Sequence, residues 1–275
     1  MLIVLIVILV LALLYVLSLR GRSGHPGFKD LQGWLYAHRG LHNESRPENS
    51  MAAFRAALEA GYGVELDVHL LSDGNLAVMH DSSLKRTAGA DVLLESLTTE
   101  QLKDYRLGGT DERIPTFQEV LDLFDGKAPL IVELKCANGN FAQLCQTACK
   151  MLDGYKGVYC LESFDPRCTL WLKKNRPELI RGQLSENYYL YPQIPVPWYL
   201  KLILTCQLEN FLLLPDFVAY KFSDRKRLDN FIVRKIWGGP GVSWTIHSQE
   251  ELDTALQEGW IGIFEGFIPK ENISR

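Results

Sequence analysis

The chain has 275 residues and a mass of 31.2 kDa, and its residues are 47% hydrophobic and 23% charged, as in an ordinary globular protein. This balance excludes intrinsic disorder and fibrous architectures. The formal net charge of −4, from 29 basic and 33 acidic residues, provides no positive field, so nucleic acid is not expected as a partner.

Residues 1–19 form an apolar run without a charged side chain, in which Tyr15 and Ser18 are the polar residues. A helix over this run would extend roughly 28 Å, close to the ~30 Å hydrocarbon core of a bilayer, so we expect a single-pass membrane anchor. The alternative is a cleaved signal peptide, but no basic region precedes the run and no small-residue cleavage site follows it. The run is followed by the basic residues Arg20, Arg22 and Lys29. Because positive charge favours the cytoplasmic side, we expect the downstream domain to lie there.

After a predicted linker over residues 20–33, residues 34–275 alternate short β-rich apolar runs with helical patterns, which favours βα units around a parallel sheet. The predicted strands are Leu35–His38, Gly63–Val68, Leu130–Leu134, Gly157–Leu161, Leu179–Gly182, Phe217–Tyr220, Gly241–Trp244 and Ile261–Phe264. Capping signals mark helix starts, for example Thr116 with Glu119 and Ser248 with Glu251. Eight such units over roughly 240 residues predict an α/β protein with a (β/α)8 TIM barrel, whose active site lies at the carboxyl ends of the strands.

Two segments differ from this regular alternation. Residues 76–126 form a long loop or insertion with a strand-like run at Leu76–His80, typical of a lid or a substrate-recognition element. Residues 195–215 are strongly apolar and are predicted to be an ordinary barrel helix, the alternative being a segment seated in a bilayer interface. The residues expected on its buried stripe are Leu200, Ile203, Leu204 and Leu208.

The six cysteines are dispersed, without a CxxC pair or a metal-ligand spacing. We therefore expect buried, reduced thiols and no disulfide framework. No pattern in the chain indicates an oligomeric state.

Acidic side chains alternate with apolar ones on the second predicted strand. Period two places Glu65 and Asp67 on the face opposite Val64 and Leu66, which in a barrel is the interior. Two ionised carboxylates there repel each other and lose hydration unless a cation compensates, and a hard divalent cation is the simplest choice. The third predicted strand repeats the pattern, with Glu133 and Lys135 on one face.

Two histidines stand at predicted strand ends, His38 in an Ala-His-Arg-Gly run and His80 in a Met-His-Asp run. Imidazoles titrate near neutrality, which suits one as a base and the other as an acid. Arg39 adds a forked cation that matches phosphate geometry. No nucleotide-binding or serine-nucleophile fingerprint is present. The remaining histidines are expected to be structural, and they are His25, His42, His69 and His247.

Seven short motifs stand in an order and spacing that resemble the glycerophosphodiester phosphodiesterase family, part of the phospholipase C-like phosphodiesterase TIM-barrel superfamily. The motifs are His38-Arg39-Gly40, Pro47-Glu48-Asn49-Ser50, Glu65-Leu66-Asp67-Val68, His80-Asp81, Glu133-Leu134-Lys135, Ser163-Phe164-Asp165 and Trp244-Thr245. The resemblance extends from about Leu35 to Pro269. Each motif alone is common, but seven in sequence on one barrel pattern are specific.

The resemblance implies a metal-dependent phosphodiesterase that cleaves glycerophosphodiesters, with lysophospholipids as possible further substrates, into glycerol 3-phosphate or a lysophosphatidate and an alcohol. It implies that Glu65, Asp67 and Glu133 hold one divalent cation, Mg²⁺ or Ca²⁺, since oxygen ligands fit either ion. It further implies that His38 and His80 form the acid–base pair. Arg39 and Lys135 would bind the phosphate and also belong to the catalytic set. The other substrate-binding residues would be Glu48, Phe164 and Trp244. The resemblance does not tell which histidine is the base.

The chain departs from the family pattern after its last predicted strand. The family usually has an Asp-Gly pair and a Thr-Asp pair here, whereas Trp260-Ile261-Gly262 and Glu265-Gly266-Phe267 precede Pro269. We expect this difference to alter the support at the barrel floor or rim. Two alternative functions are a phospholipase D-like barrel enzyme acting on intact lipids, and a catalytically silent module that binds a phosphorylated ligand. Retention of both histidines and all three carboxylates argues against the silent module.

Overall fold

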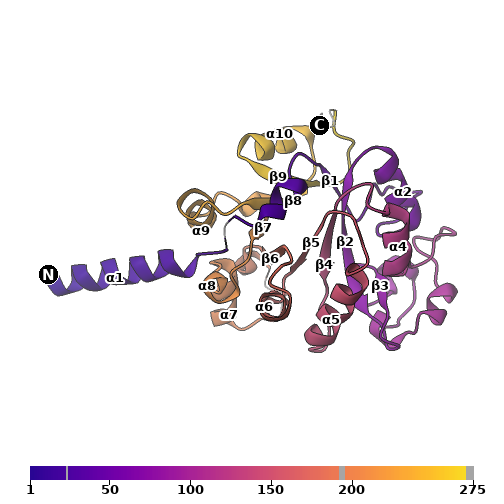
Figure 1. The fold of residues 1–275 in the computed structure, drawn as a ribbon, viewed down its shortest axis with the longest axis horizontal. Helices are drawn as coiled ribbons and strands as arrows, with labels where there is room; N and C mark the ends of the chain where they lie inside the picture. The colour runs from indigo at the N-terminus through magenta and orange to yellow at the C-terminus, as the bar shows by residue number, and fades with distance from the viewer. Residues whose placement is uncertain (23, 192–195, 271–275) are drawn as a thin grey trace.

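Eight parallel strands close into a barrel in the computed structural model, which describes residues 1–22, 24–191 and 196–270. The first strand pairs with both the second and the last, which closes the ring (Figure 1). The barrel strands are β1 (Tyr36–His38), β2 (Gly63–Leu70), β4 (Leu130–Leu134), β5 (Tyr159–Ser163), β6 (Arg181–Ser185), β7 (Phe217–Lys221), β8 (Gly241–Ile246) and β9 (Trp260–Phe264). The predicted (β/α)8 TIM barrel is confirmed.

Helices surround this ring and begin at the capping signals found in the sequence. Thr116 and Glu119 form a capping box, and the Ser248 side chain accepts from the backbone N–H of Glu251 at 3.2 Å. The longer helices around the barrel are α2 (Met51–Glu59), α4 (Phe117–Phe124), α5 (Phe141–Leu152), α6 (Pro166–Asn175), α7 (Trp198–Thr205) and α10 (Gln249–Gln257). Two four-residue helices, α8 (Asn210–Leu213) and α9 (Leu228–Phe231), and a π-helical stretch at Ile232–Ile236 complete the outer layer after β6.

The alternation of side chains along the strands produces two apolar layers. Val64 and Leu66 of β2 face outward and pack in one core with Phe54 of α2 and Phe124 of α4. Ile131 of β4 belongs to a second cluster that also gathers side chains from β1, β5, β7, β8 and β9 inside the ring. Because period two directs the other residues of each strand inward, polar groups at the carboxyl ends of the strands converge on the barrel axis.

The segment between β2 and β4 has a small core of its own. Here β3 (Leu76–Val78) pairs antiparallel with β2 outside the ring. It is followed by α3 (Lys85–Ala88) and two short 3-10 helices at Leu94–Ser96 and Glu100–Asp104. The buried residues of this separate cluster are Leu71, Ala77, Met79, Leu84, Leu94, Leu97, Leu102, Leu107 and Ile114. Helix α4, which lies within residues 76–126, packs with the main core instead.

The stretch before β1 contributes to the barrel. A 3-10 helix at Pro26–Leu31 buries Phe28 and Leu31 in the cluster inside the ring. The Tyr36 hydroxyl donates to the Leu31 carbonyl at 2.8 Å, which ties this helix to β1. The predicted linker therefore contains an ordered element that packs against the barrel.

The apolar segment predicted as one barrel helix over residues 195–215 differs from expectation. Residue 195 lies outside the described residues, and the rest contains α7 and α8 rather than one helix. None of the four residues of the predicted stripe is buried, whereas the polar residues Thr205, Gln207 and Asn210 are. The reason is that polar groups anchor this segment. Ser185 and Tyr220 donate their hydroxyls to backbone carbonyls of α7 at 2.6 and 2.9 Å.

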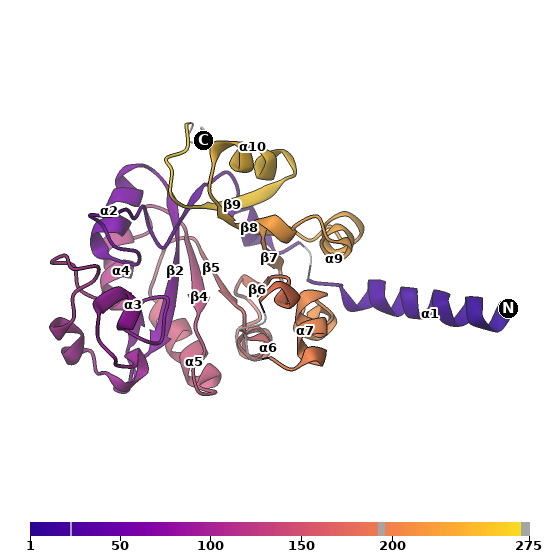
Figure 2. The ribbon, with the colours of Figure 1, turned by 180° about the vertical axis from the view of Figure 1, so that it is seen from behind.

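Helix α1 (Leu2–Ser18) extends away from the barrel, and none of its residues is buried (Figures 1 and 2). Within the described residues, no helix has both the length and the apolar character needed to cross a membrane. The predicted anchor over residues 1–19 is therefore not supported. Helix α1 has 17 residues and ends at Ser18, so it is shorter than the predicted run of 19 residues.

Candidate active site

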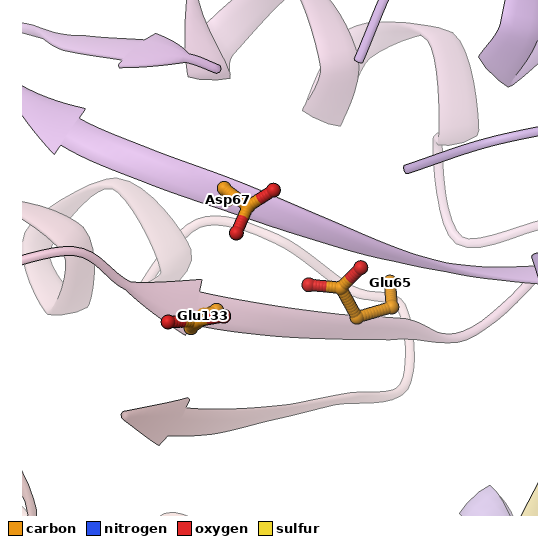
Figure 3. A group of neighbouring side chains, drawn as sticks. All are labelled: Glu65, Asp67 and Glu133. Carbon is orange, nitrogen blue, oxygen red and sulfur yellow. The ribbon is translucent and has the colours of Figure 1, made fainter. Parts of the chain in front are cut away.

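Three carboxylates from two adjacent strands meet inside the barrel. Glu65 and Asp67 lie on β2 and Glu133 on β4, and the strand register pairs Asp67 directly with Glu133. One oxygen from each side chain lies within 4.8 Å of the others (Figure 3). All three side chains are buried, with relative exposures of 3%, 1% and 7% respectively. The structure thus brings together the three residues that the sequence analysis assigned to a cation.

The charges around this carboxylate cluster are unequally distributed. Burial raises the pKa of Glu133 to about 7, and burial together with Asp67 and Glu133 raises the pKa of Glu65 well above its usual value. Burial would also raise the pKa of Asp67, but Lys135 and neighbouring cationic groups hold it far below its usual range. Among the described residues, Asp67 Oδ1 has no hydrogen-bond donor, with Lys135 Nζ 3.3 Å away.

This donor set suits a hard divalent cation. Three carboxylates supply the oxygen ligands that Mg²⁺ and Ca²⁺ prefer, and an oxygen of the most acidic one lacks a donor. A bound cation would offset the burial and the mutual repulsion that raise the pKa values of Glu65 and Glu133. The buried polar chemistry therefore fits one such ion.

His38 ends β1 between two carboxylates. Its Nε2 lies 3.8 Å from Glu65 Oε2, and its Nδ1 contacts Glu265 Oε2. Burial lowers the pKa of His38 below its usual value, although the hydrogen bond to Glu265 opposes that shift. The imidazole is thereby held next to the carboxylate cluster in its neutral form at neutral pH.

His80 follows β3 and reaches the same region from the insertion. Its Nδ1 lies 2.7 Å from Asp81 Oδ1, and burial lowers its pKa to about 4, against an opposing effect of Asp67. The backbone of His80 is fixed because His69 Nε2 lies 3.1 Å from its carbonyl oxygen, while His69 Nδ1 contacts Glu95 at 2.7 Å. This arrangement agrees with the structural role expected for His69.

Two predicted phosphate ligands line the cluster. Lys135 Nζ lies 2.9 Å from Glu133 Oε1, and Arg39 Nε lies 3.5 Å from Asp67 Oδ2. Both cations thus sit beside the carboxylates from different strands. Arg39 has a positive φ of 56°, and its backbone N–H donates to Glu65 Oε2 at 3.3 Å.

Glu48 is held by two guanidinium groups. Arg39 Nη1 donates to its Oε1 at 2.9 Å, and Arg86 donates to both of its oxygens at 2.7 and 2.8 Å. Burial would raise the pKa of Glu48, but these arginines lower it overall. The carboxylate therefore stays ionised beside Arg39.

The two predicted aromatic residues form a contact at the strand ends. Phe164 follows β5, and Trp244 lies in β8. The centroids of their rings are 5.4 Å apart, and the rings are nearly perpendicular. Phe164 also lines a cavity of about 220 Å³ that reaches the carboxylate cluster. The other residues around this cavity are His69, His80, Ser82, Glu133, Leu134, Lys135, Cys136, Ser163 and Asp165.

Several residues at the site were not singled out from the sequence. Asn49, which was named within the motif Pro47–Ser50 and given no role at the site, donates from Nδ2 to Asp67 Oδ2 at 2.9 Å, whereas Ser50 caps α2. Glu265 was noticed only as a departure after the last strand. The register of β1 with β9 was the signal that could have placed it beside His38. Glu162 of β5 is also buried inside the barrel, and its pKa is well above normal because of burial and Glu133.

Comparisons with known proteins agree with this geometry. A family model described as "Glycerophosphoryl diester phosphodiesterase family" matches residues 38–213. A glycerophosphodiester phosphodiesterase of Caldanaerobacter subterraneus subsp. tengcongensis is 29% identical over 244 residues, covering 83% of this chain and 92% of the relative. A lysophospholipase D of Rattus norvegicus is 33% identical over 133 residues, 44% of this chain and 41% of the relative.

Among solved structures, a phosphodiesterase of Oleispira antarctica in complex with the product sn-glycerol-3-phosphate has a similar fold. The TM-score is 0.72 at 23% identity, and the match covers 89% of this chain and 95% of the other. At this identity the similarity supports the barrel fold, in agreement with the strand order observed here.

Proposed function

We propose that this chain, which belongs to the glycerophosphoryl diester phosphodiesterase family, uses one divalent cation and two histidines to hydrolyse glycerophosphodiesters. The chain is a phosphoric diester hydrolase, in keeping with its family and with the activity named for the Caldanaerobacter relative. The proposed products are sn-glycerol 3-phosphate, the product held by the Oleispira structure, and an alcohol.

The observation that carries this proposal is the convergence of Glu65, Asp67 and Glu133 within 4.8 Å in a buried setting. A divalent cation held there would supply a Lewis acid that withdraws charge from a phosphoryl oxygen. Either Mg²⁺ or Ca²⁺ satisfies the ligand chemistry.

The chain's own side chains would do the remaining work. Arg39 and Lys135 would bind the non-bridging oxygens of the phosphodiester, because both are partly buried cations directed at the carboxylate cluster. One of His38 and His80 would remove a proton from the nucleophile and the other would protonate the leaving oxygen. Because burial lowers the pKa of both imidazoles, either can act as the base at pH 7, whereas the one that serves as the acid must first take up a proton.

The alcohol and glycerol parts of the substrate need further contacts. Phe164 and Trp244 would cover apolar parts of the substrate at the mouth of the barrel, and Glu48 would accept from a glycerol hydroxyl while it orients Arg39. Lysophospholipids are a proposed second substrate class, supported by the matching segment of the rat lysophospholipase D. Release of choline from lysophosphatidylcholine, compared with intact phosphatidylcholine, separates this class from a phospholipase D-like activity on intact lipids.

The experiment is to incubate the purified chain with sn-glycero-3-phosphoethanolamine and Mg²⁺ or Ca²⁺ and to measure glycerol 3-phosphate. We expect turnover that chelation abolishes, and a loss of about 10²- to 10⁴-fold in His38→Ala, the range for one acid–base group. His25→Ala is the matched control, since His25 caps the short helix before β1 and should leave turnover unchanged. Activity that survives chelation, or a fully active His38→Ala variant, contradicts the mechanism.

Cation binding can be tested without turnover. At a cation concentration of 100 times Kd, we expect wild-type stability to rise by about 2.7 kcal/mol, measured by denaturant unfolding. The variant Asp67→Asn/Glu133→Gln should lose this rise because two ligands are neutralised. An equal rise in that variant would place the cation elsewhere.

A further inference from the structure

The strand that closes the barrel places a second carboxylate against His38. In the parallel pair of β1 and β9, Ala37 is opposite Phe264, so the next residues along the two strands are His38 and Glu265. On the other side of β1, His38 is paired with Glu65. Paired residues of parallel strands project from the same face of the sheet, so a carboxylate flanks the imidazole on each side.

The two ring nitrogens of His38 have different partners. Nδ1 contacts Glu265 Oε2, while Nε2 lies 3.8 Å from Glu65 Oε2 in the carboxylate cluster. Glu265 is itself fixed, because its backbone N–H donates to the carbonyl of Ile246 at 2.9 Å. An ionised carboxylate can only accept a hydrogen bond, so the proton at this contact belongs to Nδ1.

Glu265 stays ionised in this position. The hydrogen bond from His38 and the nearby His42 imidazole hold its pKa below the usual value, with His42 Nε2 3.6 Å from the same oxygen. The other charged groups facing His38 are Arg39 and Asp67. Among all these neighbours, Glu265 is the acceptor that Nδ1 contacts directly.

We propose that Glu265 is a positioning residue for His38: it fixes the imidazole in the tautomer with the proton on Nδ1 and directs Nε2 toward the reacting phosphodiester. The consequence for turnover rests on the proposed function, whereas the tautomer is a property of the protein alone.

The direct test is nuclear magnetic resonance of the full chain labelled with ¹⁵N-histidine, at a pH where the imidazoles are neutral. His38 signals are assigned by their loss in His38→Gln. We expect wild-type His38 to carry its proton on Nδ1, and Glu265→Gln to keep that tautomer, because the amide oxygen still accepts. Glu265→Ala should shift His38 toward the Nε2–H tautomer. A wild-type His38 protonated on Nε2, or an unchanged tautomer in Glu265→Ala, overturns the proposal.

A double-mutant cycle tests the consequence for catalysis. Glu265→Ala should lower kcat by about 10- to 100-fold with little change in KM, as for other residues that orient a functional histidine, and Glu265→Gln should recover part of the loss. In the His38→Ala background, Glu265→Ala should change kcat less than twofold, because the residues act as one unit. Equal losses in both backgrounds would indicate a merely structural role and overturn the proposal.

The matched control is Glu258→Gln at the opposite end of β9. Glu258 is also ion-paired, with Arg225 at 2.8 Å, but it lies just before the strand rather than just after it. This variant should leave both kcat and the His38 tautomer unchanged. If the wild type shows no turnover with any cation, the proposed function fails, and the magnetic resonance arm still decides the role of Glu265.

Discussion

At the residue scale, burial sets the protonation of acidic groups across this barrel, and neighbouring cations decide the exceptions. Asp67 and Glu133 face each other across one register pair, yet the pKa of Asp67 is far below normal and that of Glu133 is raised to about 7. Lys135 and Arg39 lower the pKa of both groups, but Asp67 is also acted on by His80 and accepts a hydrogen bond from Asn49. The negative charge of Asp67 in turn raises the pKa of Glu133. Asp67 therefore provides the permanent negative charge of the cluster, and its partners become ionised when a cation binds.

Glu209 shows the same burial effect away from the site. Both of its carboxylate oxygens are buried without a hydrogen-bond partner among the described residues, and burial raises its pKa to about 8. The folded state therefore keeps a proton that the unfolded chain releases near pH 4.5. The contribution of Glu209 to stability is greatest below that pH, and it falls as the pH rises from 4.5 toward 8 because the native state binds more protons at this group.

Glu209→Gln should remove this dependence, because glutamine does not ionise. The free energy of unfolding of the variant minus that of the wild type should increase by roughly 2–4 kcal/mol between pH 5 and pH 8, measured by urea unfolding. Glu59→Gln on the exposed surface of α2 is the control and should show a flat difference. A flat difference for Glu209→Gln as well would mean that water reaches the Glu209 carboxylate.

The residue scale also marks what the sequence could predict of the site. Glu65, Asp67 and Glu133 could be predicted because period two along a strand fixes which side chains share a face. His38 and His80 could be predicted because they stand at strand ends. Asn49 and Glu265 were not, because their contacts depend on pairing between distant segments. Glu265 reaches His38 only when the first and last strands close the ring.

At the element scale, the predicted end of a strand is accurate at β4, which ends in the apolar residue Leu134. The prediction for Leu130–Leu134 matches β4, whereas those for β5 and β6 begin two residues too early and end two and three residues too early, respectively. The reason is that β5 ends in Glu162 and Ser163, and β6 ends in polar residues as well. These side chains face a polar barrel mouth, so a search for apolar runs stops before the strand does.

The pairing of β6 with β7 requires a glycine at position 182. Gly182 is paired with Phe217, and a Cβ at position 182 would lie 2.2 Å from the Phe217 ring. Gly182→Ala should therefore lower the free energy of unfolding by about 1–3 kcal/mol, because the buried ring must move. Urea unfolding measures this change.

Gly154 provides the matched control for Gly182→Ala. A Cβ at position 154 has no atom within 4 Å, and the residue has no positive φ. Gly154→Ala should therefore be neutral or stabilising by up to about 1 kcal/mol, through the reduced freedom of the unfolded chain. Equal effects of the two substitutions would contradict the close packing of Phe217 against β6.

At the scale of the whole molecule, α1 and the barrel meet at a short junction. Trp237 Nε1 donates to the Val16 carbonyl at 2.8 Å, and Leu19 is buried with Val218, Ile232 and Val233. Further along, Arg22 donates to both oxygens of the buried Asp216 at 2.6 Å. Residues 2–14 lie outside this junction and remain exposed along their length, with Figure 2 showing α1 pointing away from the barrel.

Because the contacts to the barrel lie in residues 15–22, two deletions should have different effects on stability. Removing residues 2–14 should leave the thermal midpoint of the barrel almost unchanged, because no buried contact is lost, and should reduce self-association by removing an exposed apolar surface. Removing residues 2–22 also deletes Leu19 and Arg22. Burial of one leucine contributes about 1.5–3 kcal/mol, and Asp216 would lose its bidentate partner inside the protein. Calorimetry should therefore show a clearly lower midpoint for the longer deletion, and equal midpoints would mean that the junction does not stabilise the barrel.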